Sequence, residues 1–157
     1  MSLRDDCRGL ESLPLKLIIV AVVASMSIAV AADGLDGLKD KDFLRRARLQ
    51  VDAIVAAAET VAVEGPGSTR TLELDFSSGG RLGFEGIAVG DSADGPGAAS
   101  VVLLLSTGAS VIGTAEDPPA WICSGDGQEL TIRSCTFHLR LECVLEGATF
   151  HVLASVV

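Results

Sequence analysis

The sequence predicts an α+β protein: a long N-terminal helix, hydrophobic first and amphipathic afterwards, followed by an antiparallel β-sheet domain. Three observations predict this order. Residues 17–32 form an uncharged apolar block, and residues 42–63 repeat apolar side chains at three- and four-residue spacing. After Pro66 the pattern changes to the alternation that is typical of strands. The chain has 157 residues, about the size of one ordinary domain.

The apolar block is the most informative part of the chain. Residues 17–32 contain no charged residue, Gly or Pro, and as a helix they would be about 24 Å long. Adding residues 13–15, with the Lys16 ammonium reaching the interface, gives about twenty residues, enough to cross a hydrocarbon core of about 30 Å. Three interpretations stay open: a cleavable secretory signal with an Ala-x-Ala site at 29–31, an uncleaved anchor, or the first half of a helix in a filament core.

The second helical stretch should cover a sheet. Residues 42–63 place their apolar side chains on one face, which predicts an amphipathic helix. Gly34 and Gly37 weaken the helical pattern between the two stretches, where we expect a bend or a pause. The sequence Gly65-Pro66-Gly67 predicts the end of the helix.

Alternating patterns and turn residues then predict a series of strands. They are expected at residues 69–76, 81–89, 99–106, 110–114, 121–123, 129–146 and 149–157. The turn residues 77–80 predict that the first two strands form a hairpin. The continuous apolar run 99–106 is typical of a central strand that is buried on both faces.

Charge and motifs exclude several function classes. The chain carries 12 Lys and Arg against 21 Asp and Glu, a formal net charge of −9. We therefore expect no nucleic-acid partner, which would need a basic stripe. No phosphate loop, dinucleotide fingerprint or Gly-x-Ser-x-Gly motif is present. His138 is expected on a polar strand face, and we predict no enzyme, no catalytic residue, no cofactor and no metal site.

The four cysteines leave the disulfide pairing open. Cys7 lies in the N-terminal leader, so an odd number remains beyond it. Cys135 and Cys143 would be about 26 Å apart on an unbroken strand, too far for a disulfide. We therefore expect Cys123 to pair with one of them, and Cys135 is the nearer in sequence. The alternative is three free, buried thiols.

This layout resembles that of type IV pilins and pilin-like proteins, most closely the archaeal ones. The resemblance rests on Arg8-Gly9 before the apolar block, on the block itself, on the amphipathic continuation and on the C-terminal β domain. In that family a dedicated signal peptidase cuts after a Gly that follows a charged residue, which implies processing at Arg8, Gly9 and Leu10. The domains implied are a leader at 1–9, a helix at 10–64 with a membrane or filament-core segment at 15–32, and an antiparallel β domain at 65–157.

The resemblance also implies which side chains make contacts. In the family the mature helix packs in the filament core, so its apolar side chains would contact other subunits or the membrane. They are Leu17, Ile18, Ile19, Val20, Val22, Val23, Ile28 and Val30. Glu11 of one subunit and Lys16 of another form a candidate charge pair.

The function implied is structural. The chain would be a pilin-like subunit of a cell-surface filament, anchored by its N-terminal hydrophobic helix. Its partners would be copies of itself or other pilin-like subunits, the membrane and the pilin-type signal peptidase. It would lie in the cell membrane with an extracellular C-terminal domain, or in an extracellular filament. The alternative is a non-polymerising β domain, membrane-tethered or secreted, that binds a partner or ligand at the cell surface.

Overall fold

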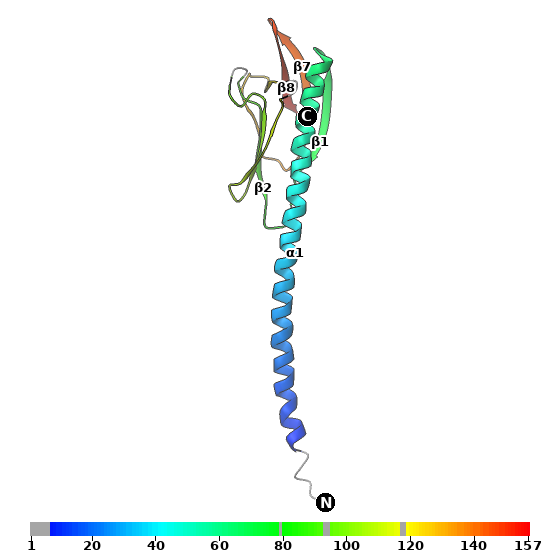
Figure 1. Ribbon diagram of the computed structural model, residues 1–157, viewed down its shortest axis with the longest axis vertical. Coiled ribbons are helices and arrows are strands. Elements are labelled where there is room, and N and C mark those ends of the chain that lie inside the picture. Colours follow the sequence, from blue (N-terminus) through cyan, green and yellow to red (C-terminus); the bar gives the residue numbers. More distant parts are fainter. Residues whose placement is uncertain (1–6, 79, 93–94, 117–118) are drawn as a thin grey trace, which may run out of the picture. The chain divides into compact units, whose positions relative to one another are not determined.

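The computed structural model describes residues 7–78, 80–92, 95–116 and 119–157 (Figure 1). Within the helix, the side chains of residues 7–14, 27 and 29–33 lie outside the description. The chain divides into two compact units, Met1–Leu38 and Lys39–Val157, here called the first and the second unit.

One helix and eight strands make up the described part of the chain. They are α1 (Cys7–Glu64), β1 (Thr69–Asp75), β2 (Phe84–Val89), β3 (Ser100–Leu105), β4 (Ser110–Thr114), β5 (Ile122–Cys123), β6 (Leu130–Ile132), β7 (Thr136–Glu146) and β8 (Thr149–Val156).

Helix α1 continues through both glycines at which a bend or pause was expected. Gly34 and Gly37 are helical, and the boundary between the two units follows directly after Leu38. The helix ends at Glu64 because Gly65 adopts a φ of 86°. The Gly65 N–H still donates to the carbonyl oxygen of Val61 at 3.2 Å, which is a common helix C-terminus.

The second unit buries one face of α1. The apolar positions of residues 42–63 supply this face, whose fully buried members are Phe43, Ala47, Val51, Ile54, Ala58 and Val61. The same hydrophobic core contains inward-facing residues of both sheets, so the helix and the sheets share one core. Gly113 of β4 lies so close to α1 that a Cβ there would be 2.7 Å from Val51 Cγ1.

Two four-stranded sheets complete the second unit. Their strand orders are β1-β7-β8-β5 and β4-β3-β2-β6. All pairs are antiparallel except β5 with β8, which is parallel. Figure 1 shows β1, β7 and β8 beside the last turns of α1, with β2 in the other sheet. Because β7 pairs along its length with both β1 and β8, it is an interior strand of its sheet.

The predicted fold class is wrong about the sheet. We expected one antiparallel sheet, and the structure has two sheets, one with a parallel pair. The expected hairpin of 69–76 with 81–89 does not form, because β1 pairs with β7 while β2 pairs with β3 and β6. The expected single strand 129–146 is divided into β6 and β7, which belong to different sheets.

The predicted fold class is also wrong about the N-terminal helix. Among the described residues, no helix has both the length and the apolar character needed to cross a membrane. The expected long apolar helix with a membrane segment at 15–32 is corrected accordingly. Lys16 precedes the uncharged run, and Asp33 and Asp36 follow it. Sixteen residues of helix make only about 24 Å, less than a hydrocarbon core of about 30 Å.

Gln50 fixes the end of β1 to the helix. Its side-chain amide donates to the backbone carbonyl of Asp75 at 2.7 Å, and its Oε1 accepts the Asp75 N–H at 2.8 Å. The side chain thus satisfies both backbone groups of Asp75, as a neighbouring strand would do. Both hydrogen bonds link residues that are 25 positions apart in the chain.

We expect Gln50→Ala to lower the free energy of unfolding by about 1 to 2 kcal/mol, because two hydrogen bonds at a partly solvated site are lost. Urea unfolding followed by circular dichroism measures the change. Gln128→Ala is the matched control, because its side chain is exposed. An equal loss in both variants would contradict the role given to Gln50.

Candidate functional site

The first candidate site is the apolar segment, defined here as residues 15–28 of α1. Its large aliphatic side chains are exposed, with exposed fractions between 48% for Val22 and 69% for Ile28. They are Leu15, Leu17, Ile18, Ile19, Val20, Val22, Val23, Met26 and Ile28. Seven of the eight side chains predicted to contact other subunits are in this set. The eighth, Val30, has its side chain outside the described residues.

The residues expected at the processing site lie at the start of α1. The backbones of Arg8, Gly9 and Leu10 are helical, and so is that of Glu11. The side chains of these residues lie outside the description, while Lys16 is exposed. Processing after Gly9 and the charge pair of Glu11 with Lys16 therefore stay predictions.

The second candidate site is a pocket of about 470 Å³ in the second unit, which we call the terminal pocket. Its wall combines the last turn of α1, the residues before β5, and the hairpin of β7 and β8. The lining residues are Ala62, Val63, Pro119, Ala120, Trp121, Cys143, Ala148, Thr149, Phe150, His151 and Val152. Nine of these eleven side chains are apolar, so the pocket favours an apolar occupant.

Two aromatic side chains lie at the terminal pocket without being buried. The chain has five Phe, one Trp and no Tyr. Phe43, Phe76 and Phe137 are buried in the core. Trp121 and Phe150 are 43% and 54% exposed, and both line the terminal pocket. Exposed aromatic side chains that gather around one pocket indicate a binding surface.

His151 separates the terminal pocket from a second hollow of about 280 Å³. The imidazole is 8% exposed, and its Nε2 lies 3.5 Å from Glu146 Oε2. Cys123 and Ser124 line the second hollow. Burial raises the pKa of the Cys123 thiol, and the carboxylates of Glu146 and Asp126 raise it further.

Cys123 and His151 do not form the nucleophile–base pair that is typical of cysteine enzymes. A nucleophilic cysteine needs a lowered pKa, so that thiolate is present at neutral pH. Cys123 has its pKa raised instead. The described residues contain no group of three or more His, Cys, Asp or Glu that could hold a metal ion.

The expected disulfide between Cys123 and Cys135 does not form, and both residues are free thiols. The sheet explains why. Cys123 pairs with Leu153 of β8, and Leu153 pairs with Glu142 of β7. Cys135 precedes Glu142 by seven residues, or about 23 Å at the rise of a strand. The two cysteines therefore lie at distant points of the sheet.

Cys143 is also a free thiol. It lies on β7, and Cys123 lies on β5, with β8 between them. Two strand spacings put their Cα atoms about 10 Å apart, beyond the reach of a disulfide. The alternative of three free, buried thiols describes Cys123 and Cys143, whereas Cys135 is exposed.

We expect Cys135 to react with iodoacetamide much faster than Cys123 and Cys143 at pH 7.5. Cys135 is exposed, whereas burial raises the pKa values of the other two thiols and lowers their thiolate fractions. Mass spectrometry of labelled peptides against time measures each rate. Labelling in urea is the control, because unfolding should make the three rates similar. Equal rates in the native protein would contradict this burial.

The sequence predicted part of these sites and missed the rest. His138 is exposed on its strand, as expected. The terminal pocket was not predicted, because its walls come from three separate stretches of chain. Trp121 and Phe150 are hard to recognise as pocket residues from the sequence, since aromatic residues in strands usually face a core.

Three comparisons with known proteins found no match: no family model, no curated protein and no solved structure is similar to this chain.

Proposed function

We propose that the chain is a structural subunit of a surface filament, and that it assembles through the apolar segment. The observation that supports this is the exposure of the large aliphatic side chains between Leu15 and Ile28. Covering one such side chain is worth roughly 1.5 to 3 kcal/mol. In a single chain these side chains remain in water. An assembly of several chains would bury them and gain this stabilisation.

The apolar side chains surround the helix and do not form a stripe. Residues 17–20 and 22–23 are all Leu, Ile or Val, and successive helical residues point about 100° apart. A helix that is apolar on all sides is buried in a core or an assembly. Contact with one flat surface would leave part of the segment exposed, so we propose that several helices surround each other.

Small side chains make close packing of such helices possible. Ala21, Ala24 and Ser25 lie within the segment and are exposed. The Ser25 hydroxyl donates to the carbonyl oxygen of Val22 at 2.8 Å, so its polar group is satisfied inside the helix. Small residues allow helix backbones to approach each other. We therefore propose that the segment packs against the same segment of other copies.

Sedimentation velocity of the full-length chain tests the proposal. The wild type should form assemblies whose size grows with concentration. The variant Ile19→Lys with Val23→Lys should associate much more weakly than the wild type, because two charges on one helix face prevent dry packing. Its melting temperature should equal that of the wild type, since these side chains are exposed and contribute no core contact.

The matched control is Leu104→Lys with Ile112→Lys. These two aliphatic side chains are also exposed, but they lie on β3 and β4. The control should assemble like the wild type. A wild-type chain that stays monomeric at every concentration, or an Ile19→Lys and Val23→Lys variant that assembles normally, would overturn the proposal.

A further inference from the structure

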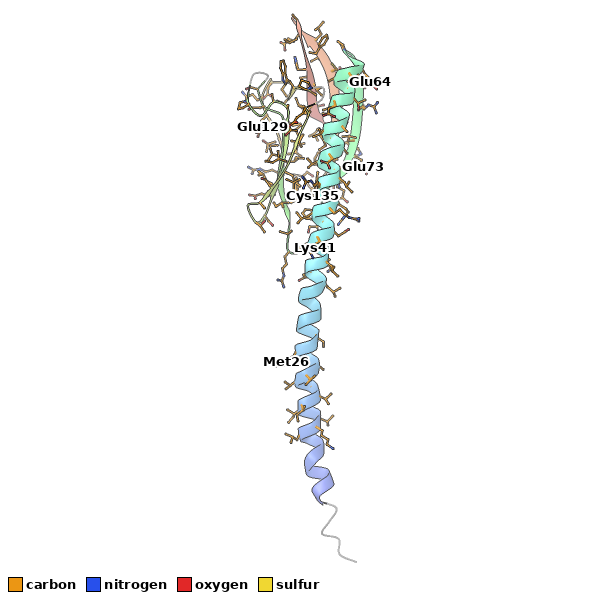
Figure 2. All side chains as sticks on the ribbon, in the orientation of Figure 1. Met26, Lys41, Glu64, Glu73, Glu129 and Cys135 are labelled. Atoms are coloured by element: carbon orange, nitrogen blue, oxygen red, sulfur yellow. The ribbon has the colours of Figure 1, made fainter. Side chains whose placement is uncertain are left out.

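The second unit is basic at one end of its helix. Five basic residues lie within ten positions of α1: Lys39, Lys41, Arg45, Arg46 and Arg48. Asp42 forms ion pairs with two of them, with Arg45 at 3.4 Å and with Arg46 at 3.1 Å. Asp40 is the other acidic residue among these ten positions, so five positive and two negative charges leave a formal excess of three positive charges at this end. Figure 2 shows Lys41 well away from Glu64, which ends the helix about 35 Å further along.

The opposite end, around the terminal pocket, is acidic. Glu146 lines the adjoining hollow, and its side chain is 82% exposed. Glu116 forms a backbone bridge with Pro119 of the pocket wall. Glu64 follows Val63 of the wall, but Arg70 neutralises it through an ion pair at 2.7 Å, so the excess of negative charge comes from Glu116 and Glu146. No Lys or Arg lines the pocket or the hollow among the described residues.

The basic end also carries an exposed aliphatic side chain. Four exposed side chains lie on one side of α1 at helical spacing: Lys41, Arg45, Arg48 and Leu49. They lie on the side of α1 away from the buried Ile54 and Val61, and we call them the basic face. The exposed Asp52 lies on the same side, one turn after Arg48. Leu49 is 62% exposed, next to Arg48 and one turn after Arg45.

We propose that the terminal pocket binds the basic face of a second copy of this chain. Leu49 of one copy enters the pocket and covers Trp121 and Phe150 of the other. Arg45 and Arg48 lie against the carboxylates of Glu116 and Glu146. The charges of the two surfaces are opposite, and each surface has an uncovered apolar group at its centre. This combination of an apolar centre and a charged rim is typical of specific interfaces.

The two surfaces differ, so the contact is heterologous and can repeat from copy to copy. It would add a second contact to the assembly made by the apolar segment. The inference rests on the proposed function only in assuming that the chain associates with itself. The basic face and the terminal pocket both lie in the second unit, so the two proposals can fail separately.

Charge exchange between the two surfaces tests the contact. Every chain carries Ile19→Lys and Val23→Lys, so that association through the apolar segment is removed. The basic-face variant adds Arg45→Glu and Arg48→Glu, and the pocket variant adds Glu116→Lys and Glu146→Lys. Each variant alone brings like charges together, and its dissociation constant should rise about tenfold or more. Their equimolar mixture should associate again, because every contact between unlike chains joins opposite charges.

Two readouts follow the association. Sedimentation velocity gives the size, and the emission of Trp121 reports on the pocket, because it is the one Trp of the chain. On association the emission should move to shorter wavelength, and acrylamide should quench it less. Leu49→Ser should weaken both effects. The matched control, Glu73→Lys with Glu85→Lys, changes charge equally on β1 and β2 and should behave like its parent.

Some results would overturn the inference. One is a mixture that stays dissociated, and another is association without a change in Trp121 emission. A shift of Trp121 emission on adding naphthalene, with no effect of the charge variants on association, would assign the pocket to a small apolar ligand instead. If the parent with Ile19→Lys and Val23→Lys assembles as fully as the wild type, the proposed function fails, while the mixing experiment still decides the pocket contact.

Discussion

Replacing Gly90 with Ala is expected to lower the free energy of unfolding of the second unit by about 3 to 5 kcal/mol. Gly90 follows β2 with a φ of 71°, a conformation that side chains with a Cβ rarely adopt. A Cβ would also lie 1.9 Å from the carbonyl oxygen of Ile122 and 2.4 Å from its carbonyl carbon. Because the obstacle is backbone, no side-chain rotation can relieve the clash.

The position matters because Gly90 connects the two sheets. Its N–H donates to the carbonyl oxygen of Ser100, the first residue of β3, at 2.8 Å. The next N–H, that of Asp91, donates to the carbonyl oxygen of Ile122 at 3.1 Å, at the start of β5. Moving this backbone away from Ile122 would break one of the hydrogen bonds that hold β5, and the residues directly before β5 line the terminal pocket.

Gly108→Ala separates the conformational effect from the clash. Gly108 has a similar φ of 79°, but a Cβ there would meet no atom within 4 Å. Gly108→Ala should lower the free energy of unfolding only by the cost of placing a Cβ on a left-handed backbone, about 1 to 2 kcal/mol. Urea unfolding of both variants measures the difference. Equal losses would show that the close approach of Gly90 to Ile122 is unimportant.

Replacing Gly113 with Val is expected to destabilise the second unit by about 2 to 3 kcal/mol. A Cβ at this position of β4 would lie 2.7 Å from Val51 Cγ1 and 2.9 Å from Val55 Cγ2. Both obstacles are β-branched side chains of a helix, which have few alternative rotamers. The strand would therefore have to move away from α1, and the shared core would open at this edge.

A second substitution tests whether the clash is the cause. Val55→Ala should cost little by itself, since Val55 is only half-buried. In the double variant, Val55→Ala should recover part of the stability that Gly113→Val loses, because the effects of substitutions at two residues in contact do not simply add. Thermal unfolding of the four proteins gives the coupling. If the stability losses of the two single variants simply add up to that of the double variant, direct contact between β4 and this turn of the helix is contradicted.

The elements of the second unit could be predicted better than their pairing. The apolar spacing of residues 42–63 predicts the buried face of α1, including Val51, Ile54 and Val61. The strand predicted at 110–114 has the bounds of β4. Periodicity reports which residues face a core, but it says nothing of which strand lies alongside. For this reason the pairing of β1 with β7 was missed.

One error could have been found in the pattern itself. Ile132 and Phe137 are both buried, and they lie five positions apart. Residues on one face of a continuous strand are separated by an even number. The odd spacing marks the point where the chain leaves one sheet for the other, between β6 and β7.

The two candidate sites also differ in how far they can be predicted from the sequence. The apolar segment is contiguous in sequence, so hydropathy alone predicted it, and the structure shows that its described side chains are exposed. The terminal pocket combines residues near 62, 120 and 150, which only the fold brings together. Proximity in sequence also misled the disulfide prediction, because Cys123 and Cys135 are close in the chain and distant in the sheet.

Labelling of a cysteine inside the apolar segment tests the central claim most directly. In full-length Val22→Cys, a water-soluble maleimide should react slowly when the protein is assembled and rapidly when it is diluted to monomers. Peptide mass spectrometry separates this site from the native cysteines. Leu104→Cys, at another exposed aliphatic position, should react rapidly in both states. Equal labelling of Val22→Cys at high and low concentration would contradict burial of the segment between copies of the chain.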